Sequence, residues 1–134
     1  MPNLADVTAV LISDLSSIPE IASNFEEIFV PPRREFRYPA LMLDLIRVDL
    51  LNEKYYGFYD LNYLFTIFVK QRKREGLRLL DILISKFNKF SSYNDTFKIA
   101  YVAEYNSGYN DLFDLDSGII AITTAWKVRT IFKE

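Results

Sequence analysis

The chain has 134 residues, the size of one domain, and can bury roughly two thirds of its unfolded surface. It contains no histidine and no cysteine, which excludes imidazole bases, thiol nucleophiles, thiolate metal sites and disulfides. Its 16 basic and 18 acidic residues give a net charge of -2. This balance argues against a protein that grips nucleic acid mainly by neutralising phosphates.

The apolar content is high for a soluble domain, at 50% hydrophobic and 16% aromatic residues. No apolar run approaches the roughly 18 residues of a membrane span, so we expect no membrane contact. We expect the surplus of apolar residues to lie in a protein interface. The first residues, Met-Pro-Asn-Leu-Ala-Asp, lack the basic and apolar regions of a signal peptide. Together with the lack of cysteine, this favours an intracellular origin.

The first predicted element is an amphipathic helix over residues 4–17, with Asn3 as its N-cap. Its apolar residues recur at three- and four-residue steps: Leu4, Val7, Leu11, Leu15 and Ile18. Pro19 interrupts the pattern and leaves room for a short extra turn over 19–23. Residues 24–39 predict a loop, with a brief strand over 28–30.

A charged segment lies inside this loop. It consists of Arg33, Arg34, Glu35, Phe36 and Arg37. Because the charge of the chain is balanced, we interpret the segment as a solvated loop or a salt-bridging interface arm, with a phosphate contact as the alternative.

The cleanest signal is the period-two alternation over residues 55–70, which predicts a strand. One face is wholly apolar and is expected on the core: Tyr59, Leu61, Tyr63, Phe65, Ile67 and Val69. The other face is mixed and is expected to be partly wet: Phe58, Asp60, Asn62, Leu64, Thr66 and Phe68. Residues 40–51 predict a preceding strand with two apolar faces, hence an interior strand or one covered by a neighbour on each side. The polar residues 52–54 predict the hairpin connection, and Gly57 is a candidate bulge.

The basic run over residues 70–75 predicts a solvated turn from strand to helix, because no aromatic residue is interleaved to stack on bases. A second helix is expected over 75–90. Its apolar face carries Leu80, Leu83, Ile84, Phe87 and Phe90. Residues 91–95 predict a turn-rich linker, and residues 97–105 alternate as a third long strand.

Residues 106–118 break the alternation and predict a loop. Its Asp111, Asp114 and Asp116 suggest calcium, yet they lack the spacing of an EF-hand and its bidentate glutamate. We therefore favour an acidic loop in solvent or at a subunit contact. Residues 119–132 predict the closing strand, with Trp126 on its core-facing side and a ligand platform as the alternative role for that ring.

No catalytic motif accompanies these elements. A serine triad needs a histidine or a substitute base, and the four glycines are scattered instead of forming a phosphate-binding loop. We expect no enzymatic activity, no cofactor, no metal and no sequence-specific binding of nucleic acid.

The elements together predict a single α+β domain over residues 1–134. We expect an antiparallel or mixed sheet of about four long strands in two hairpins, with two main helices packed on one face. The expected order is helix, strand, strand, helix, strand, strand (α-β-β-α-β-β).

In this order and length the sequence resembles the phage tail-terminator or tail-completion proteins, a group that includes the minor tail protein U family. Four segments carry the resemblance: the helix from Leu4 to Leu15, Tyr38-Pro39-Ala40 at the start of the first long strand, the helix from Leu77 to Phe90, and the closing strand from Ile119 to Phe132. The likeness covers nearly the whole chain as one of pattern and order.

The resemblance implies a homohexameric ring on the end of the tail tube. Such a ring halts tube polymerisation and faces the head-tail connector, so tube protein and connector are the implied partners. The implied location is the tail or neck of the virion, after assembly in the host cytoplasm. Alternatives are a head-tail connector, a tube subunit, or a small-molecule or peptide binding module that uses Trp126 and the tyrosines.

A ring is a heterologous assembly, in which one patch of each subunit meets a different patch of the next. The candidate interface residues come from the charged segment, the wet face of the second long strand and the acidic loop. They are Arg33, Arg34, Phe36, Phe58, Asp60, Asn62, Tyr109, Phe113 and Asp114.

Overall fold

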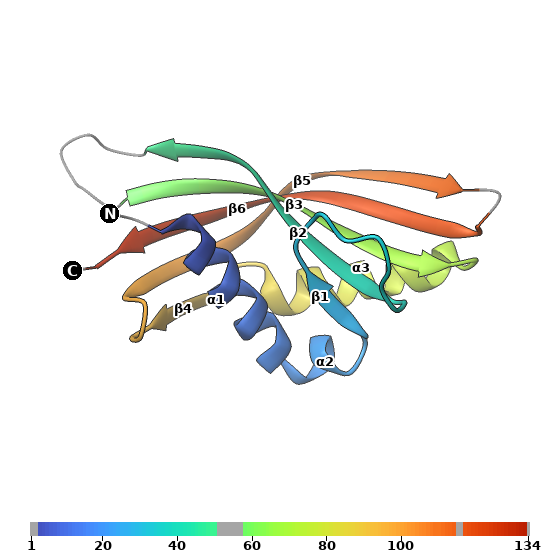
Figure 1. Cartoon of the computed structure of the whole chain (residues 1–134), viewed down its shortest axis with the longest axis horizontal. Helices are drawn as coiled ribbons and strands as arrows, with labels where there is room; N and C mark the ends of the chain where they lie inside the picture. Colours follow the sequence, from blue (N-terminus) through green and yellow to red (C-terminus); the bar gives the residue numbers. More distant parts are fainter. Residues whose placement is uncertain (1–2, 51–57, 115–116, 134) are drawn as a thin grey trace.

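A computed structural model describes residues 3–50, 58–114 and 117–133, with the backbone alone over 107–114. It is an α+β domain with a six-stranded sheet and three helices (Figure 1). In chain order the elements are α1 (Leu4–Ser17), α2 (Pro19–Ala22), β1 (Glu27–Phe29), β2 (Ala40–Leu50), β3 (Phe58–Lys70), α3 (Lys73–Phe87), β4 (Ser91–Asn94), β5 (Ile99–Asp114) and β6 (Ile119–Phe132). The predicted order of the long elements is confirmed. The four expected long strands are present, but the sheet has six described strands, because β1 and β4 each add a short one.

The strands are arranged in the order β1-β2-β3-β6-β5-β4. All neighbours are antiparallel except β1 and β2, which makes the sheet mixed. β3 and β6 form its centre and pair along their whole described length, from Phe58 opposite Ile131 to Lys70 opposite Ile119. The helices lie on one side of the sheet, and the other side carries no helix in the described part of the chain (Figure 1).

The helices form as their sequences dictate. The side chain of Asn3 accepts a hydrogen bond from the Ala5 amide, which caps α1 as predicted. α3 begins and ends slightly earlier than expected, and Phe90 lies beyond it while still stacking on Phe87 at 5.1 Å between ring centroids. Leu79 of α3 is buried, although the sequence analysis left it off the apolar face.

The core lies between α1, α3 and the helix-facing side of the sheet. Period two holds along β3 and β6, whose core-facing residues are buried. At its centre Phe65 stacks on Trp126 at 5.0 Å, and Phe87 of α3 lies 5.9 Å from Trp126. Trp126 is 1% exposed and its Nε1 donates to Thr124 Oγ1, so its predicted place in the core is confirmed.

Two segments expected to be irregular are strands. The predicted loop over 106–118 is wrong, because β5 continues to Asp114 opposite Ile119. Register shifts between Tyr105 and Ser107, and again before Asn110, absorb the residues that break the alternation. Residues 91–94 form β4 against residues 99–102 of β5 instead of a linker, since backbone pairing at a sheet edge tolerates polar side chains.

β2 also departs from its predicted role as a fully interior strand. β1 pairs with it only over Ala40–Met42, and within the described residues no strand lies beside it on that side beyond Met42. A register shift between Leu45 and Arg47 then turns Val48 onto the helix-facing side, opposite Leu61. The predicted bulge at Gly57 lies outside the described residues.

Candidate functional site

Exposed apolar side chains gather at the two edges of the sheet. Eight large hydrophobic side chains are exposed in the described part of the chain, and only Leu77 of α3 lies away from the edges. The other seven form two groups. The β2-edge patch consists of Val30, Ile46, Val48 and Leu50, and the β4-edge patch consists of Tyr93, Phe97 and Val102.

The β2-edge patch follows from the length of β1. Because β1 ends at Phe29, the second half of β2 has no described neighbour on that side, and Ile46, Val48 and Leu50 are 54%, 38% and 51% exposed. Val48 and Leu50 point to the helix-facing side, since they pair with Leu61 and Tyr59 of that side. An open strand edge with apolar side chains is a ready template for another chain.

A groove beside this patch separates α1 from β2 and has a volume of about 390 Å³. Its α1 wall carries mostly small side chains, Ala5, Thr8 and Ala9, which leave the space open. Residues of β2 and of the loop after β1 also line it, namely Leu43, Asp44, Leu45, Val30 and Pro31. The groove therefore offers an apolar floor, because Leu43 and Leu45 pair with the core-facing Phe65 and Tyr63, whereas Asp44 pairs with Leu64 of the other face.

Tyr93 and Val102 of the β4-edge patch lie on the opposite face of the sheet. Val102 pairs with Arg129, and Arg129 pairs with Asp60 on the helix-free side. Tyr93 pairs with Ala100, and Ala100 pairs with Ile131 on the same side. The Lys133 ammonium lies 5.2 Å from the centroid of the Tyr93 ring. Tyr93 is 48% exposed, so its ring and this cation face solvent together.

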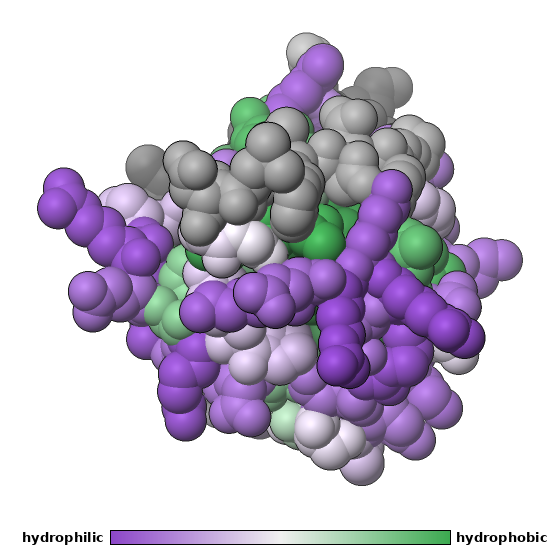
Figure 2. All heavy atoms as spheres, turned by 90° about the vertical axis from the view of Figure 1, so that its right-hand side faces the viewer, coloured by the Kyte–Doolittle hydropathy of each residue, from purple (hydrophilic) through white to green (hydrophobic). Residues whose placement is uncertain are grey.

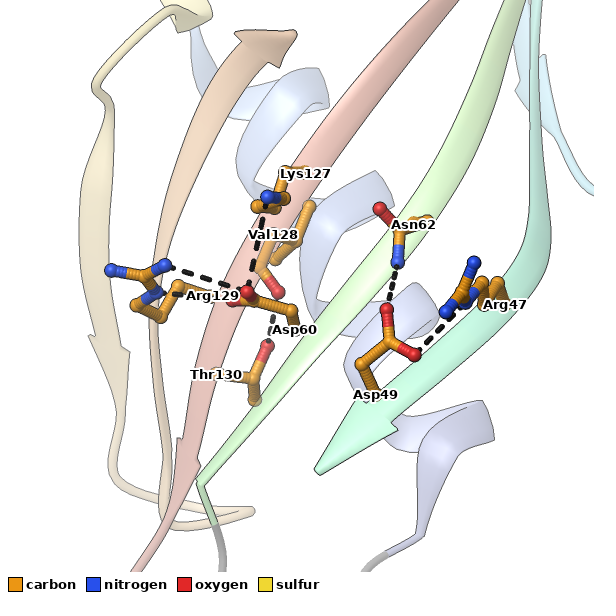
Figure 3. Close-up of polar contacts among 8 residues, drawn as sticks. All are labelled: Arg47, Asp49, Asp60, Asn62, Lys127, Val128, Arg129 and Thr130. Carbon is orange, nitrogen blue, oxygen red and sulfur yellow. Dashed lines mark hydrogen bonds and ion pairs between the residues drawn. The ribbon is translucent and has the colours of Figure 1, made fainter. Parts of the chain in front are cut away.

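Asp60 and Asn62, two of the predicted interface residues, are occupied within their own sheet (Figure 3). Asp60 is only 5% exposed and accepts a hydrogen bond from Arg129 Nε at 3.0 Å, with Lys127 Nζ at 4.0 Å. This contact raises the pKa of Arg129. Asn62 donates to Asp49, which also pairs with Arg47 at 2.9 Å. These side chains connect β2, β3 and β6 on the helix-free face.

The charged segment of the proline-rich loop folds back on its own sheet. Phe36 packs against Phe29 at 4.7 Å and Phe68 at 5.0 Å, so it anchors the loop. Arg33 pairs with Glu27 and Arg37 with Glu26, so both arginines form salt bridges within their own chain, and the interface role stays a prediction. Arg34 is exposed.

Both basic segments of the sequence meet at one end of the molecule. Lys70 Nζ lies 5.1 Å from the centroid of the Tyr38 ring, which brings residues 70–74 beside the charged loop. Figure 2 shows this end as mainly hydrophilic. The alternative of a phosphate contact stays a prediction, since no ligand tests it.

The remaining predicted site residues lie on the long hairpins. Phe58 begins β3 and is half-buried. Tyr109, Phe113 and Asp114 belong to β5 by their backbone, and their side chains lie outside the description. Asp111 and Asp114 pair with Ile122 and Ile119, while Asp116 lies outside the described residues. No group of three or more carboxylates that would hold a metal occurs among the side chains that are described.

The two edge patches are not predicted from the sequence. The apolar pattern on both faces of β2 is the available signal, but it equally fits an interior strand. Which strand lies at an edge depends on the length of its neighbour, and β1 is three residues long. The β4-edge patch was hidden because β4 itself reads as polar.

Known protein-family models and curated proteins give no significant match to this sequence. Within the described residues, no helix combines the length and the hydrophobicity needed to cross a membrane.

Proposed function

We propose that this chain is a structural subunit that assembles with copies of itself into a ring on the end of a phage tail tube. The ring stops tube polymerisation and joins the tail to the head connector. One observation carries the proposal: seven of the eight exposed large hydrophobic side chains of the described chain lie in two patches on opposite edges of the sheet. Exposed apolar side chains grouped at a sheet edge favour a protein interface.

The placement of the patches favours a heterologous contact over a two-fold dimer. Val48 and Leu50 of the β2-edge patch lie on the helix-facing side, and Tyr93 and Val102 of the β4-edge patch lie on the helix-free side, so these are different surfaces. A two-fold contact would join one patch to its own copy and leave the other in water. Head-to-tail contacts cover both and generate rings when the rotation closes.

Leu50 of the β2-edge patch and Tyr93 of the β4-edge patch also lie at the same end of the sheet. Leu50 pairs with Tyr59, and the same row continues through Thr130 and Tyr101 to Ser92 of β4. Successive copies would therefore add side by side at one level along the strands. This arrangement favours a planar ring over a rising filament.

The tail-terminator role rests on the resemblance of the order of elements to that family. The observed order of the long elements, with the parallel β1 added before Tyr38-Pro39-Ala40, is compatible with that role. The alternative of a ligand-binding module loses its main candidate residue, because Trp126 is buried in the core.

Negative-stain microscopy and native mass spectrometry of the purified protein test the assembly. We expect closed rings of one subunit number, six by the resemblance. A strict monomer at high concentration would contradict the proposal.

Gold-labelled antibody on phage particles that contain the protein tests its place in the virion. We expect label at the end of the tail next to the head. Label along the whole tail would instead identify a tube subunit, and label within the portal side of the neck would identify a head-tail connector.

A further inference from the structure

One end of the molecule concentrates basic side chains, which the balanced charge of the whole chain does not show. The proline-rich loop and the segment that enters α3 contribute eight of the 16 basic residues: Arg33, Arg34, Arg37, Lys70, Arg72, Lys73, Arg74 and Arg78. The acidic residues of the same segments and of their ion pairs are Glu26, Glu27, Glu35 and Glu75. Asp114 also belongs to this end, because it pairs with Ile119, which pairs with Lys70. Positive charge is therefore in excess here, although the net charge of the chain is -2.

Contacts between the two segments join them into one surface. Lys70 Nζ lies 5.1 Å from the centroid of the Tyr38 ring. Arg78 of α3 donates to Asn24 Oδ1 at 3.1 Å, close in sequence to the glutamates that pair with the loop arginines. The start of α3 thus lies beside the loop, and Figure 2 shows the hydrophilic side chains of this end together.

Half of these cations are not neutralised by carboxylates. Three arginines pair with glutamates: Arg33, Arg37 and Arg78. Among the described side chains, no carboxylate lies within ion-pair distance of four other exposed cations: Arg34, Lys70, Arg72 and Arg74. The N-cap residue of α3, Arg72, makes no side-chain capping hydrogen bond, so the positive end of the helix dipole adds to the same surface.

The fold also supplies the aromatic rings that the basic run over residues 70–75 lacks. The Tyr38 ring lies beside Lys70, and its centroid is 5.1 Å from that of Phe36. Both rings are half-buried, which leaves part of each accessible. Cations for phosphates together with aromatic rings for bases are typical of surfaces that bind single-stranded nucleic acid. The carboxylates of an acidic protein would use the cations but not the rings.

We propose that this end binds the phosphate backbone of a single-stranded nucleic acid without reading its sequence. Arg34, Arg72 and Arg74 contact phosphates, since the guanidinium fork matches two phosphate oxygens. Lys70 adds a point charge, and Tyr38 adds a surface on which a base can stack. The contact needs only one copy of the chain, so it goes beyond the proposed ring and does not depend on it.

Fluorescence anisotropy tests this binding with a labelled oligothymidylate of about 16 nucleotides, long enough to span one such site. The titration is repeated at several salt concentrations. Four phosphate contacts predict a slope of about -2.8 for the logarithm of the binding constant against that of the salt concentration. Absence of binding at low salt, or binding that does not depend on salt, would overturn the inference.

Arg72→Gln/Arg74→Gln removes two of these cations without breaking an ion pair. We expect the slope to fall to about -1.4 and the binding to weaken by about 20-fold at about 0.1 M salt. Arg34→Gln should reduce the slope by about 0.7 and weaken binding by about fivefold. Variants that fold as the wild type does, by circular dichroism, and bind the oligonucleotide equally well would contradict the site.

Arg47→Gln is the matched control. Arg47 has a side chain that is 72% exposed and lies on β2 away from this end, so its substitution should leave the affinity and the slope unchanged. Equal weakening by Arg47→Gln would mean that the overall charge, and not this surface, controls binding.

Polyglutamate and oligouridylate complete the comparison. Oligouridylate should bind with similar affinity, because DNA and RNA share the phosphates that the contacts use. Polyglutamate should compete weakly, and its binding in the absence of oligonucleotide binding would identify an acidic protein as the partner and overturn the inference. A strictly monomeric protein that binds the oligonucleotide would leave this inference standing while the ring proposal failed.

Discussion

At the scale of single residues, Gly76 shows how closely α3 packs on the sheet. A Cβ at this position would clash with Cδ1 of Ile122 and lie 3.3 Å from Cγ2 of Val69. Both neighbours are buried, so they have little room to move away. The glycine is therefore required by packing and not by its backbone angles.

We expect Gly76→Ala to lower the free energy of unfolding by ~1–2 kcal/mol, because overpacking outweighs the gain in helix propensity of at most ~1 kcal/mol. Ile122→Val removes the clashing methyl group. The double variant should therefore be less destabilised than the sum of the two single variants, measured by denaturant unfolding. Strict additivity would show that the clash is relieved in another way.

Two buried tyrosines link α1 to the sheet. The hydroxyl of Tyr63 lies 2.6 Å from Thr8 Oγ1, and the hydroxyl of Tyr101 donates to Asp14 at 2.6 Å. Burial raises the pKa of Tyr63 to about 12, and burial together with the carboxylate of Asp14 raises the pKa of Tyr101. Both phenols are therefore held in their protonated form in the folded protein.

This predicts a loss of stability at alkaline pH. Below pH 10 the Tyr63 phenol is protonated in the folded and unfolded states, so its contribution is complete. Between pH 10 and pH 12 the unfolded chain releases the proton first, and the free energy of unfolding should fall by about 3 kcal/mol from this group. Tyr63→Phe should reduce the fall in denaturation midpoint with pH. An equal slope in the Tyr63→Phe variant would contradict the assignment.

At the scale of elements, the open half of β2 is the feature on which assembly depends. Val48→Lys places a charge on the helix-facing side of this edge, as natural edge strands do to block pairing with other chains. We expect subunit association to be lost in analytical ultracentrifugation. Because Val48 is already partly exposed, the stability of the monomer should change by only about 0.5 kcal/mol.

Leu77→Lys is the control for this prediction. It introduces the same charge at an exposed hydrophobic residue of α3, outside both patches, and should leave association intact. Equal loss of association in the two variants would mean that added charge alone, and not the β2 edge, is responsible.

Elements with strong periodicity could be predicted from the sequence, and those defined by their neighbours could not. The alternation of β3 and β6 and the proline after α1 specify their boundaries locally. β4 has no apolar periodicity and forms only because β5 lies beside it. The continuation of β5 past Tyr105 likewise depends on the long partner strand β6.

The candidate site was harder to predict for the same reason. Phe36 and Asp60 are predicted interface residues, because an aromatic ring in a loop and a charge on a wet face suggest contact with another subunit. Both instead find partners within their own chain. A sequence pattern shows which residues are apolar or charged, but the partner of each depends on strand order, which is a property of the whole sheet.

At the scale of the whole molecule, stability should decline from the centre of the sheet toward its edges. β3 and β6 are paired on both sides along most of their length, whereas β1 and β4 are short edge strands. In hydrogen exchange of the dissociated protein, we expect the backbone amides of β3 and β6 to exchange most slowly. The amides of β4 and of the second half of β2 should exchange fast.

Association should change this pattern locally. Amides of β2 beyond Met42 and of the β4–β5 turn should gain protection when the protein is concentrated enough to assemble, while those of β3 should not change. Protection gained only on α3 would place the contact elsewhere.

The position of the single tryptophan has a practical consequence. Trp126 is enclosed by Phe65, Phe87 and Tyr105, and its ring nitrogen is hydrogen-bonded inside the domain. Its fluorescence emission reports the interior and is shielded from events at the rim of the sheet. Unfolding should therefore shift the emission to longer wavelength, whereas ring formation should leave the spectrum unaltered. One optical signal can follow folding while light scattering follows association in the same sample.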